Sequence, residues 1–144
     1  MPRDLHLTAA GRLRGVGQRY TPNRRTIVQA LAAASRPLPV SEILARRRGL
    51  PQSSVYRNLL VLEQAGVVRR IQSSDEFSRF ELAEDLIGHH HHLVCSSCGS
   101  IEDFDAPSHL ERAVARTVDL IAESSRFGVE AHHLQLTGLC SACS

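Results

Sequence analysis

Four cysteines in two pairs are the residues of this sequence best suited to chemistry. Their spacing is Cys95-x-x-Cys98 and Cys140-x-x-Cys143, and the chain has no other cysteine. In a reducing compartment such pairs indicate metal ligands before disulfides. Zn²⁺ prefers four thiolates in a tetrahedron, and each pair can present two sulfurs to one side of the ion. The spacing predicts a structural zinc site that joins a turn near residue 98 to the C-terminal segment, with free thiols or disulfides as the alternatives.

A run of four histidines, from His89 to His92, precedes the first cysteine pair. Successive side chains of an extended strand point to opposite faces. His90 and His92 would share one face, and His89 and His91 the other, so one strand could supply two different metal sites. The alternatives are a solvated polar run or the remnant of a tag, which is not expected between two structured segments.

Charge divides the chain into a basic and an acidic half. Residues 1–82 hold 14 Arg against 6 Asp and Glu, whereas residues 83–144 hold 3 Arg against 9 Asp and Glu. A basic half of this kind favours a polyanionic partner. Arg57 could contact guanine edges or phosphates, and Tyr56 could contact thymine methyls or sugars. The alternative is a solvated basic face.

The elements expected in the basic half follow the order of a winged helix-turn-helix. A helix begins at Thr21-Pro22, since Thr is a good cap and Pro suits the first helical position. A short helix is expected around residues 40–44. A third helix is expected over about 53–65, where apolar residues recur at the spacing of one helix face. Two strands follow at 67–71 and 78–82.

The acidic half is expected to form a smaller domain of strands and one helix. Residues 83–88 resemble a hinge, which separates a DNA-binding domain at 1–82 from a second domain at 89–144. The fold class is therefore α+β, with an N-terminal winged helix-turn-helix domain. The elements expected after the hinge are strands at about 90–95 and 101–104, a helix over about 108–123 and a strand over about 129–136.

Several motifs, taken together, point to one family. They are Arg19-Tyr-Thr21-Pro-Asn-Arg24, Ser54-Val55-Tyr56-Arg57-Asn-Leu59, Glu63-Gln-Ala65-Gly66-Val67-Val68, Ser78-Arg79-Phe80-Glu81-Leu82, the histidine run leading into Leu93-Val94-Cys95-x-x-Cys98-Gly99, and Gly138-Leu-Cys140-x-x-Cys143. In this combination the sequence resembles the ferric uptake regulator family over about residues 12–144. The resemblance implies a homodimeric repressor that binds double-stranded operator DNA when a regulatory metal is bound, with a C-terminal α/β dimerisation domain.

The resemblance also assigns site residues by position. It implies a structural Zn²⁺ at the four cysteines, and a hinge regulatory site formed by Glu81, His90, His92 and Asp103. A further metal site would use His89, His91, His132 and a helix carboxylate, which we take as Glu111 although His109 could compete. The expected DNA contacts are Arg19, Arg24, Ser54, Tyr56 and Arg57.

One feature departs from the family pattern. Many members complete the hinge site with a histidine from the DNA-binding domain, but this chain has no histidine between His6 and His89. Pro37 stands about where that ligand is expected. The domains would then be clamped through Glu81, or with help from His6, unless the further site does the sensing.

The regulatory metal is less well defined than the sites. Nitrogen and oxygen ligands admit Fe²⁺, Zn²⁺, Mn²⁺ or Ni²⁺, of which we favour the first two. Alternatives to a metal-responsive repressor are a DNA-binding protein with structural zinc only, a peroxide-sensing regulator, although that branch usually has Asp in place of Glu81, and a zinc hydrolase. An enzyme is not expected, because the sequence has no HExxH motif. A cytoplasmic protein without membrane contact is expected, since no signal or membrane-spanning run is present.

Overall fold

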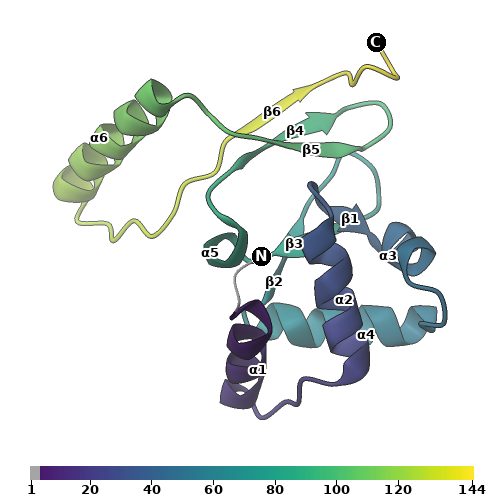
Figure 1. Ribbon diagram of the computed structural model, residues 1–144. Helices are drawn as coiled ribbons and strands as arrows, with labels where there is room; N and C mark the ends of the chain where they lie inside the picture. Colours follow the sequence, from purple (N-terminus) through teal and green to yellow (C-terminus); the bar gives the residue numbers. More distant parts are fainter. Residues whose placement is uncertain (1–3) are drawn as a thin grey trace.

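The computed structural model describes residues 4–144. They form two three-stranded sheets, and different helices lie next to each sheet (Figure 1). The first sheet has the strand order β1-β3-β2 and lies among four helices. None of the helices in the described residues is both long and apolar enough to cross a membrane. The elements of this first part are α1 (Leu5–Gly15), α2 (Pro22–Ala33), β1 (Leu38–Pro39), α3 (Val40–Arg46), α4 (Gln52–Gln64), β2 (Val68–Ile71) and β3 (Arg79–Leu82).

Local chemistry explains where the central helices begin and which face they bury. The Thr21 hydroxyl accepts a hydrogen bond from the Arg24 amide, which caps α2, and Pro22 occupies the first helical position. In α4 the side chains of Val55, Leu59 and Leu62 are fully buried at helical spacing. These features confirm the helices and the hairpin predicted in the winged order.

The first helix was not predicted from the sequence. α1 buries Leu5, Ala9 and Leu13, which recur every four residues and pack against α2, α4 and the sheet. That spacing was the available signal, but polar residues and Gly11 between them obscure it. The same apolar core includes Phe80 of β3, which is 1% exposed.

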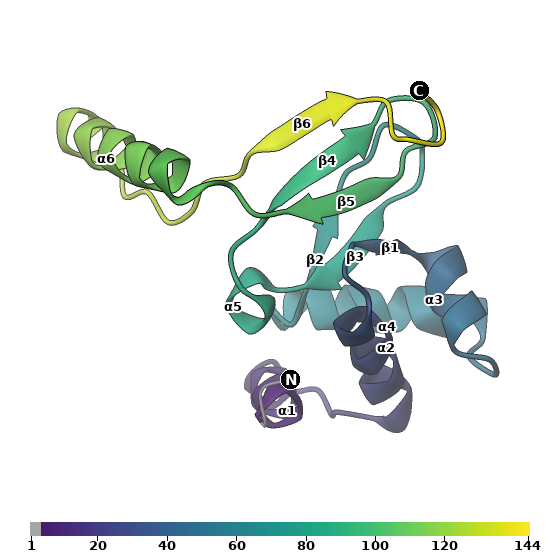
Figure 2. The same cartoon turned by 45° about the horizontal axis from the view of Figure 1, so that its top comes forward.

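The second sheet has β4 at its centre. β4 (His91–Cys95) pairs antiparallel with β5 (Ile101–Phe104) and parallel with β6 (Gln135–Gly138). α6 (Ser108–Ser125) connects β5 to the return segment and stands off one end of the sheet (Figure 2). The last strand was predicted over 129–136, which is wrong at its start: pairing with β4 begins at Gln135, and the preceding segment has no neighbouring strand to pair with.

The segment between the two parts is a short helix held by the first part. α5 (Glu84–Ile87) receives an ion pair from Arg12 to Asp85, and Arg12 also donates to the Gly66 carbonyl at 2.6 Å. Leu86 packs against the first core. The next residue, Gly88, has φ of 96°, a left-handed conformation that glycine adopts without strain.

A second contact joins the two parts at the tip of the β2–β3 hairpin, residues 72–78. The Ser74 hydroxyl donates to the Cys95 carbonyl at 2.6 Å, and the Ser73 hydroxyl donates to the Gly99 carbonyl. The Asp75 carboxylate lies so close to Gly99 that a β-carbon there would collide with it. The hairpin tip therefore rests on the turn that carries the first cysteine pair.

Candidate metal centres

The two cysteine pairs come together at the end of the second sheet. Cys95 ends β4, and Cys140 follows β6 directly, so the parallel pairing of these strands carries both pairs to the same place. The Sγ atoms of Cys98 and Cys140 are 3.7 Å apart, and the four sulfurs all lie within 4.8 Å of one another. This is the clustering that tetrahedral zinc requires.

The electrostatics of the four thiols favour a bound cation. Backbone amides of Cys140 and Cys98 donate to the Cys95 sulfur, and they lower the pKa of Cys95 to about 6. The neighbouring thiols have the opposite effect on Cys143: contact with Cys140 above all raises its pKa to about 12. Four thiolates at this distance need a positive charge among them, and Zn²⁺ fits the donor set.

A second cluster, which we call the hinge cluster, consists of Glu81, His90, His92 and Asp103. The histidines come from the start of β4, Asp103 lies opposite His92 on β5, and Glu81 comes from β3 of the first part. One possible ligand atom from each residue lies within 4.8 Å of all the others. His90 Nε2 is 2.9 Å from Glu81 Oε2, and His92 Nε2 is 3.2 Å from Glu81 Oε1.

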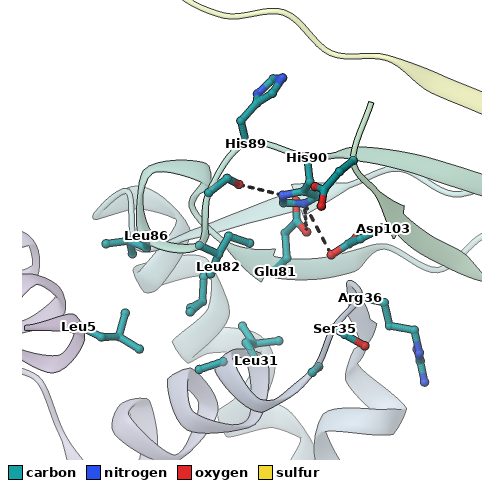
Figure 3. A pocket seen from close by; sticks show the side chains of 15 residues that line it. Leu5, Leu31, Ser35, Arg36, Glu81, Leu82, Leu86, His89, His90 and Asp103 are labelled. Carbon is teal, nitrogen blue, oxygen red and sulfur yellow. Dashed lines mark hydrogen bonds and ion pairs between the residues drawn. The ribbon is translucent and has the colours of Figure 1, made fainter. Parts of the chain in front are cut away.

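The orientation of His90 suits a metal ligand. Its Nδ1 lies 2.9 Å from the Gly88 carbonyl, which can only accept, so this nitrogen carries the proton. Nε2 lies 2.9 Å from Glu81 Oε2 and donates to it when it carries a proton; a cation that replaced this proton would meet the Nε2 lone pair. Figure 3 shows the His90 ring beside Glu81 and Asp103, with His89 turned away from them. Metal-bound histidines commonly hold their second nitrogen in this way.

The two carboxylates of the hinge cluster are largely buried, and neighbouring positive groups balance their negative charges only in part. Burial raises the pKa of Glu81, but the hydrogen bond with His92 and the charge of Arg69 outweigh it, and the pKa falls below its usual value. Burial raises the pKa of Asp103, and the Glu81 charge adds to the increase. The Asp103 Oδ1 atom is buried without a hydrogen-bond partner among the described residues. An unpartnered buried oxygen beside two imidazoles fits a divalent cation.

A third cluster gathers around Glu111 of α6. Glu111 Oε1 is 2.5 Å from His91 Nε2 and 3.2 Å from His89 Nε2, while Oε2 is 3.1 Å from His132 Nε2. His109, the alternative to Glu111, belongs to none of the metal-suited clusters found among residues 4–144.

The hydrogen bonds of His91 differ from those of His90. The Leu134 amide donates to His91 Nδ1 at 3.2 Å, so a neutral His91 carries its proton on Nε2 and donates it to Glu111. This bond is the main reason why the pKa of Glu111 is lowered. A metal at His91 Nε2 would leave the ring proton on Nδ1, facing the Leu134 amide, whereas His90 keeps its proton on Nδ1 against the Gly88 carbonyl when a metal takes Nε2. The hinge cluster is the better prepared of the two.

Comparison with known proteins leads to the same type of protein as the three metal-suited clusters and the winged-helix fold. The model of the ferric uptake regulator family matches residues 15–137. The chain belongs to this family. It is accordingly a metal-responsive transcriptional repressor built from a DNA-binding domain and a dimerisation domain.

Individual relatives of the family agree in sequence and in fold. The peroxide-responsive repressor PerR of Staphylococcus saprophyticus is 32% identical over 135 residues, which cover 91% of this chain and 86% of that protein. The ferric uptake regulator of Vibrio cholerae superposes with a TM-score of 0.70 at 26% identity, covering 89% of this chain and 96% of that one. The Pseudomonas aeruginosa ferric uptake regulator with manganese gives 0.68 at 26% identity, covering 91% and 96%.

The residues expected to bind DNA divide into two groups in this family member. Tyr56, 52% exposed, and Arg57 project from α4 into solvent, and Arg19 is also exposed. The other two have internal partners: Arg24 Nε donates to Asn58 Oδ1 at 2.9 Å, and the Ser54 hydroxyl accepts from Asn58. Arg24 therefore ties α2 to α4 through Asn58, and Ser54 holds the Asn58 amide from within α4.

The family's missing histidine has no substitute from the first helix. His6 Nδ1 lies 2.7 Å from the Tyr20 hydroxyl, and His6 belongs to none of the metal-suited clusters in residues 4–144. The rim of the first domain offers Ser35 and Arg36 instead, beside a cavity of about 670 Å³ that reaches His90 and Asp103. Among the described residues of the first domain, from residue 4 on, only Glu81 enters the hinge cluster.

Sequence reasoning missed one residue of the hinge cluster's surroundings, Arg69. Its Nε–H donates to Glu81 Oε1 at 2.6 Å. Arg69 and Glu81 are directly paired across the β2–β3 hairpin. The predicted hairpin contained this signal, since facing residues of opposite charge are favourable cross-strand pairs.

Proposed function

We propose that this repressor senses a divalent metal at the hinge cluster and then binds operator DNA as a homodimer. The observation that carries the proposal is the position of Glu81. This residue belongs to a strand of the DNA-binding domain, yet its Oε2 atom is 2.9 Å from His90 Nε2 of the other domain. A ligand set drawn from both domains can couple its occupancy to their relative orientation.

The mechanism depends on how this chain's residues hold the two domains together. Glu81 and Asp103 repel each other when both are ionised, which opposes closure at the hinge. A bound divalent ion would supply the positive charge that both carboxylates face. His90, fixed by the Gly88 carbonyl, and His92 hold the second domain in register with Glu81. Two recognition helices of a dimer would then stand about one DNA turn, ~34 Å, apart.

The coupling free energy that this mechanism requires between the metal site and the DNA site is small. A tenfold gain in operator affinity corresponds to about 1.4 kcal/mol of coupling between the metal and DNA sites. A single hydrogen bond to a charged group contributes about that much. Four ligands shared between the domains are therefore sufficient to produce a usable response.

The homodimer is supported by apolar surface that the chain leaves uncovered. α6 buries none of its side chains, and it stands away from the rest of the chain (Figure 1). A face of this kind calls for a partner, and a second copy of the chain can present the same face. Exposed apolar residues lie on α6 and just after it, at Leu120, Ile121 and Phe127, and at β6 and its end, at Leu136 and Leu139.

The ligand set restricts the regulatory metal without selecting one. Two imidazoles and two carboxylates suit Fe²⁺ or Zn²⁺, which we favour, and admit Mn²⁺ or Ni²⁺. Titration of zinc-replete protein with each of these four ions, followed by DNA binding, distinguishes them. An operator-binding protein acts where the genome is, so we place it in the cytoplasm.

Gel-shift titration tests the proposal. The DNA is a duplex selected from a random pool by the metal-loaded protein, and the protein is zinc-replete at its cysteines. We expect added metal to increase operator affinity at least about tenfold, and Asp103→Ala or His92→Ala to remove the increase. Glu102→Ala, which changes an exposed neighbour of Asp103, is the matched control. Equal affinity with and without added metal would contradict metal gating.

Sensing at the third cluster is the competing arrangement within this proposal. His132→Ala separates the two, because it disrupts the third cluster and leaves the hinge ligands in place. We expect this variant to keep most of the metal response. A response that survives His92→Ala but not His132→Ala would move the sensor to Glu111 and its histidines.

Peroxide sensing is a second candidate, favoured by the name of the 32% identical relative. Peroxide should then abolish DNA binding by the Fe²⁺-loaded protein and spare the Zn²⁺-loaded protein, because only iron reduces peroxide. A protein with structural zinc only would hold one metal per chain and bind no second ion. We do not adopt the zinc hydrolase, since the family consists of regulators.

A further inference from the structure

Arg69 lies directly behind the hinge cluster. It sits on β2 opposite Glu81, with its side chain 21% exposed against 5% for Glu81. Its Nε–H donates to Glu81 Oε1 at 2.6 Å, and its Nη2 atom is 2.5 Å from the same oxygen. Both nitrogens of the guanidinium edge therefore lie close to one carboxylate oxygen, but only Nε–H makes a hydrogen bond with it, and Nη2 is buried without a hydrogen-bond partner among the described residues.

This contact divides the Glu81 carboxylate between two partners. Oε1 is held by Arg69 and also lies 3.2 Å from His92 Nε2, while Oε2 faces His90 Nε2 at 2.9 Å. An ion placed among His90, His92 and Asp103 would meet Oε2 without competition, but it would have to share Oε1 with the guanidinium of Arg69. Arg69 thus weakens one of the two oxygens that Glu81 can offer to an ion.

The contact also changes the charge that an ion would encounter. Ionised Glu81 and Asp103 together carry two negative charges, and the guanidinium of Arg69 cancels one of them. The guanidinium is permanently charged and mostly buried, so water screens it poorly. A divalent ion in the cluster is therefore opposed by a cation on the far side of its own ligand.

We propose that Arg69 is a specificity-determining residue of the hinge cluster. It raises the metal concentration at which the site fills, and it disfavours ions that need many oxygen ligands, such as Mn²⁺, relative to Zn²⁺, which accepts four ligands. This inference rests on the proposed function of the hinge cluster as a metal site. It adds a fixed cation that sets the threshold and the preference of that site.

Metal affinity of the zinc-replete protein tests this role. Mn²⁺ and Zn²⁺ are titrated separately, by calorimetry and by competition with a chelator, in a Glu111→Ala background so that the hinge cluster is the site observed. Arg69→Met removes the charge and keeps the length of the side chain. We expect it to bind Mn²⁺ at least about tenfold more tightly, with a smaller gain for Zn²⁺, so that the preference for Zn²⁺ falls.

Two further variants separate charge from shape. Arg69→Lys keeps the charge but gives up the planar fork, so it should free Oε1 in part and shift the Mn²⁺ to Zn²⁺ affinity ratio less than Arg69→Met. Arg70→Met is the matched control, because Arg70 on the same strand pairs with Glu63 instead. It should leave both affinities unchanged.

The melting temperature without added metal tests whether Arg69 and Glu81 form an ion pair. Arg69→Met leaves Glu81 buried without its cation, so the melting temperature of the zinc-replete protein should fall before any hinge metal is added. If Arg69→Met does not fold, Arg69→Lys carries the test, and an unchanged affinity ratio in that variant would overturn the inference.

The outcomes distinguish this inference from the proposed function. If the Arg69 variants bind both metals more weakly, or if the affinity ratio stays within about twofold of that of the parent, Arg69 is a structural residue only and the inference fails alone. If the parent protein takes up no ion at the hinge cluster, both proposals fail together.

Discussion

Glu81 and Asp103 face the same pair of imidazoles, but the protein treats their charges differently. Arg69 and His92 compensate Glu81, and its pKa is lowered in spite of burial. Asp103 lies farther from its imidazole partners, 3.7 Å from His90 Nε2 and 3.6 Å from His92 Nε2, and burial above all raises its pKa. The cost of the cluster in the absence of a metal is therefore concentrated on Asp103, the residue with the unpartnered oxygen.

The pH dependence of Asp103→Asn should reveal this cost. Because the pKa of Asp103 is higher in the folded state, its contribution to stability is fully present below the ordinary carboxyl pKa of about 4 and is lost as pH rises. Without hinge metal, Asp103→Asn should melt a few degrees higher than the parent at pH 7.5, and the difference should narrow toward pH 5. Thermal denaturation measures both. Asp105→Asn, an exposed change two residues away, should show no such trend.

At the scale of elements, the hairpin tip and the cysteine turn depend on each other. Gly99 has φ of 77°, and the Asp75 carboxylate occupies the space where a side chain would go. Gly99→Ala should therefore lose about 1–2 kcal/mol from the left-handed backbone alone, with a further loss from the collision. Chemical denaturation measures the change, and Asp75→Ala in the same chain should recover the collision part only.

A glycine elsewhere in the second domain provides the control for this prediction. Gly128 has no atom within 4 Å of a built β-carbon and has no positive φ. Gly128→Ala should change the free energy of unfolding little. If Gly99→Ala and Gly128→Ala were equally stable, the hairpin tip would not rest on the cysteine turn as described.

If α4 is the recognition helix, as proposed, substitutions on it separate overall DNA affinity from sequence preference. Arg57→Ala should weaken binding to all duplexes about equally and lower the salt slope by roughly one unit, as loss of a phosphate contact does. Tyr56→Ala should reduce preference for the operator over a scrambled duplex. Fluorescence anisotropy over a salt series measures both quantities. Unchanged preference in Tyr56→Ala would remove this residue from base reading.

Some of these features could be predicted from residues alone, and the reasons differ from one to another. The two-sided use of the histidine run follows from the alternation of side chains in a strand. The contact of Arg69 with Glu81 depends on the register of the hairpin, which a shift of one residue would destroy. The start of β6 depends on where β4 can pair with it, and α1 gains its stability from a core that its own sequence does not reveal. A local sequence pattern does not reveal which distant strands pair with each other.

At the scale of the whole molecule, the proposed homodimer places the exposed face of α6 between the two copies. Leu120→Asp should place a charge in the dimer interface and weaken self-association at least about tenfold. Operator affinity should fall with it, since two half-sites must be bound together. Sedimentation velocity and gel shift measure the two effects. Leu7→Asp, an equally exposed leucine on α1, should change neither.

The attachment of α5 to the first domain limits where the chain can bend between the two domains. Because Arg12 and Leu86 hold that short helix on the DNA-binding side, the freely rotating bonds between the domains are reduced to those around Gly88. Gly88 also offers the carbonyl that orients His90, so the pivot and the ligand are adjacent in the chain. α4 lies on the side of its domain far from β4 (Figure 1). On the proposed mechanism, a few degrees of rotation at Gly88, next to His90, would move α4 through a wide arc, so that a small change at the hinge cluster becomes a large change at the proposed DNA-binding surface.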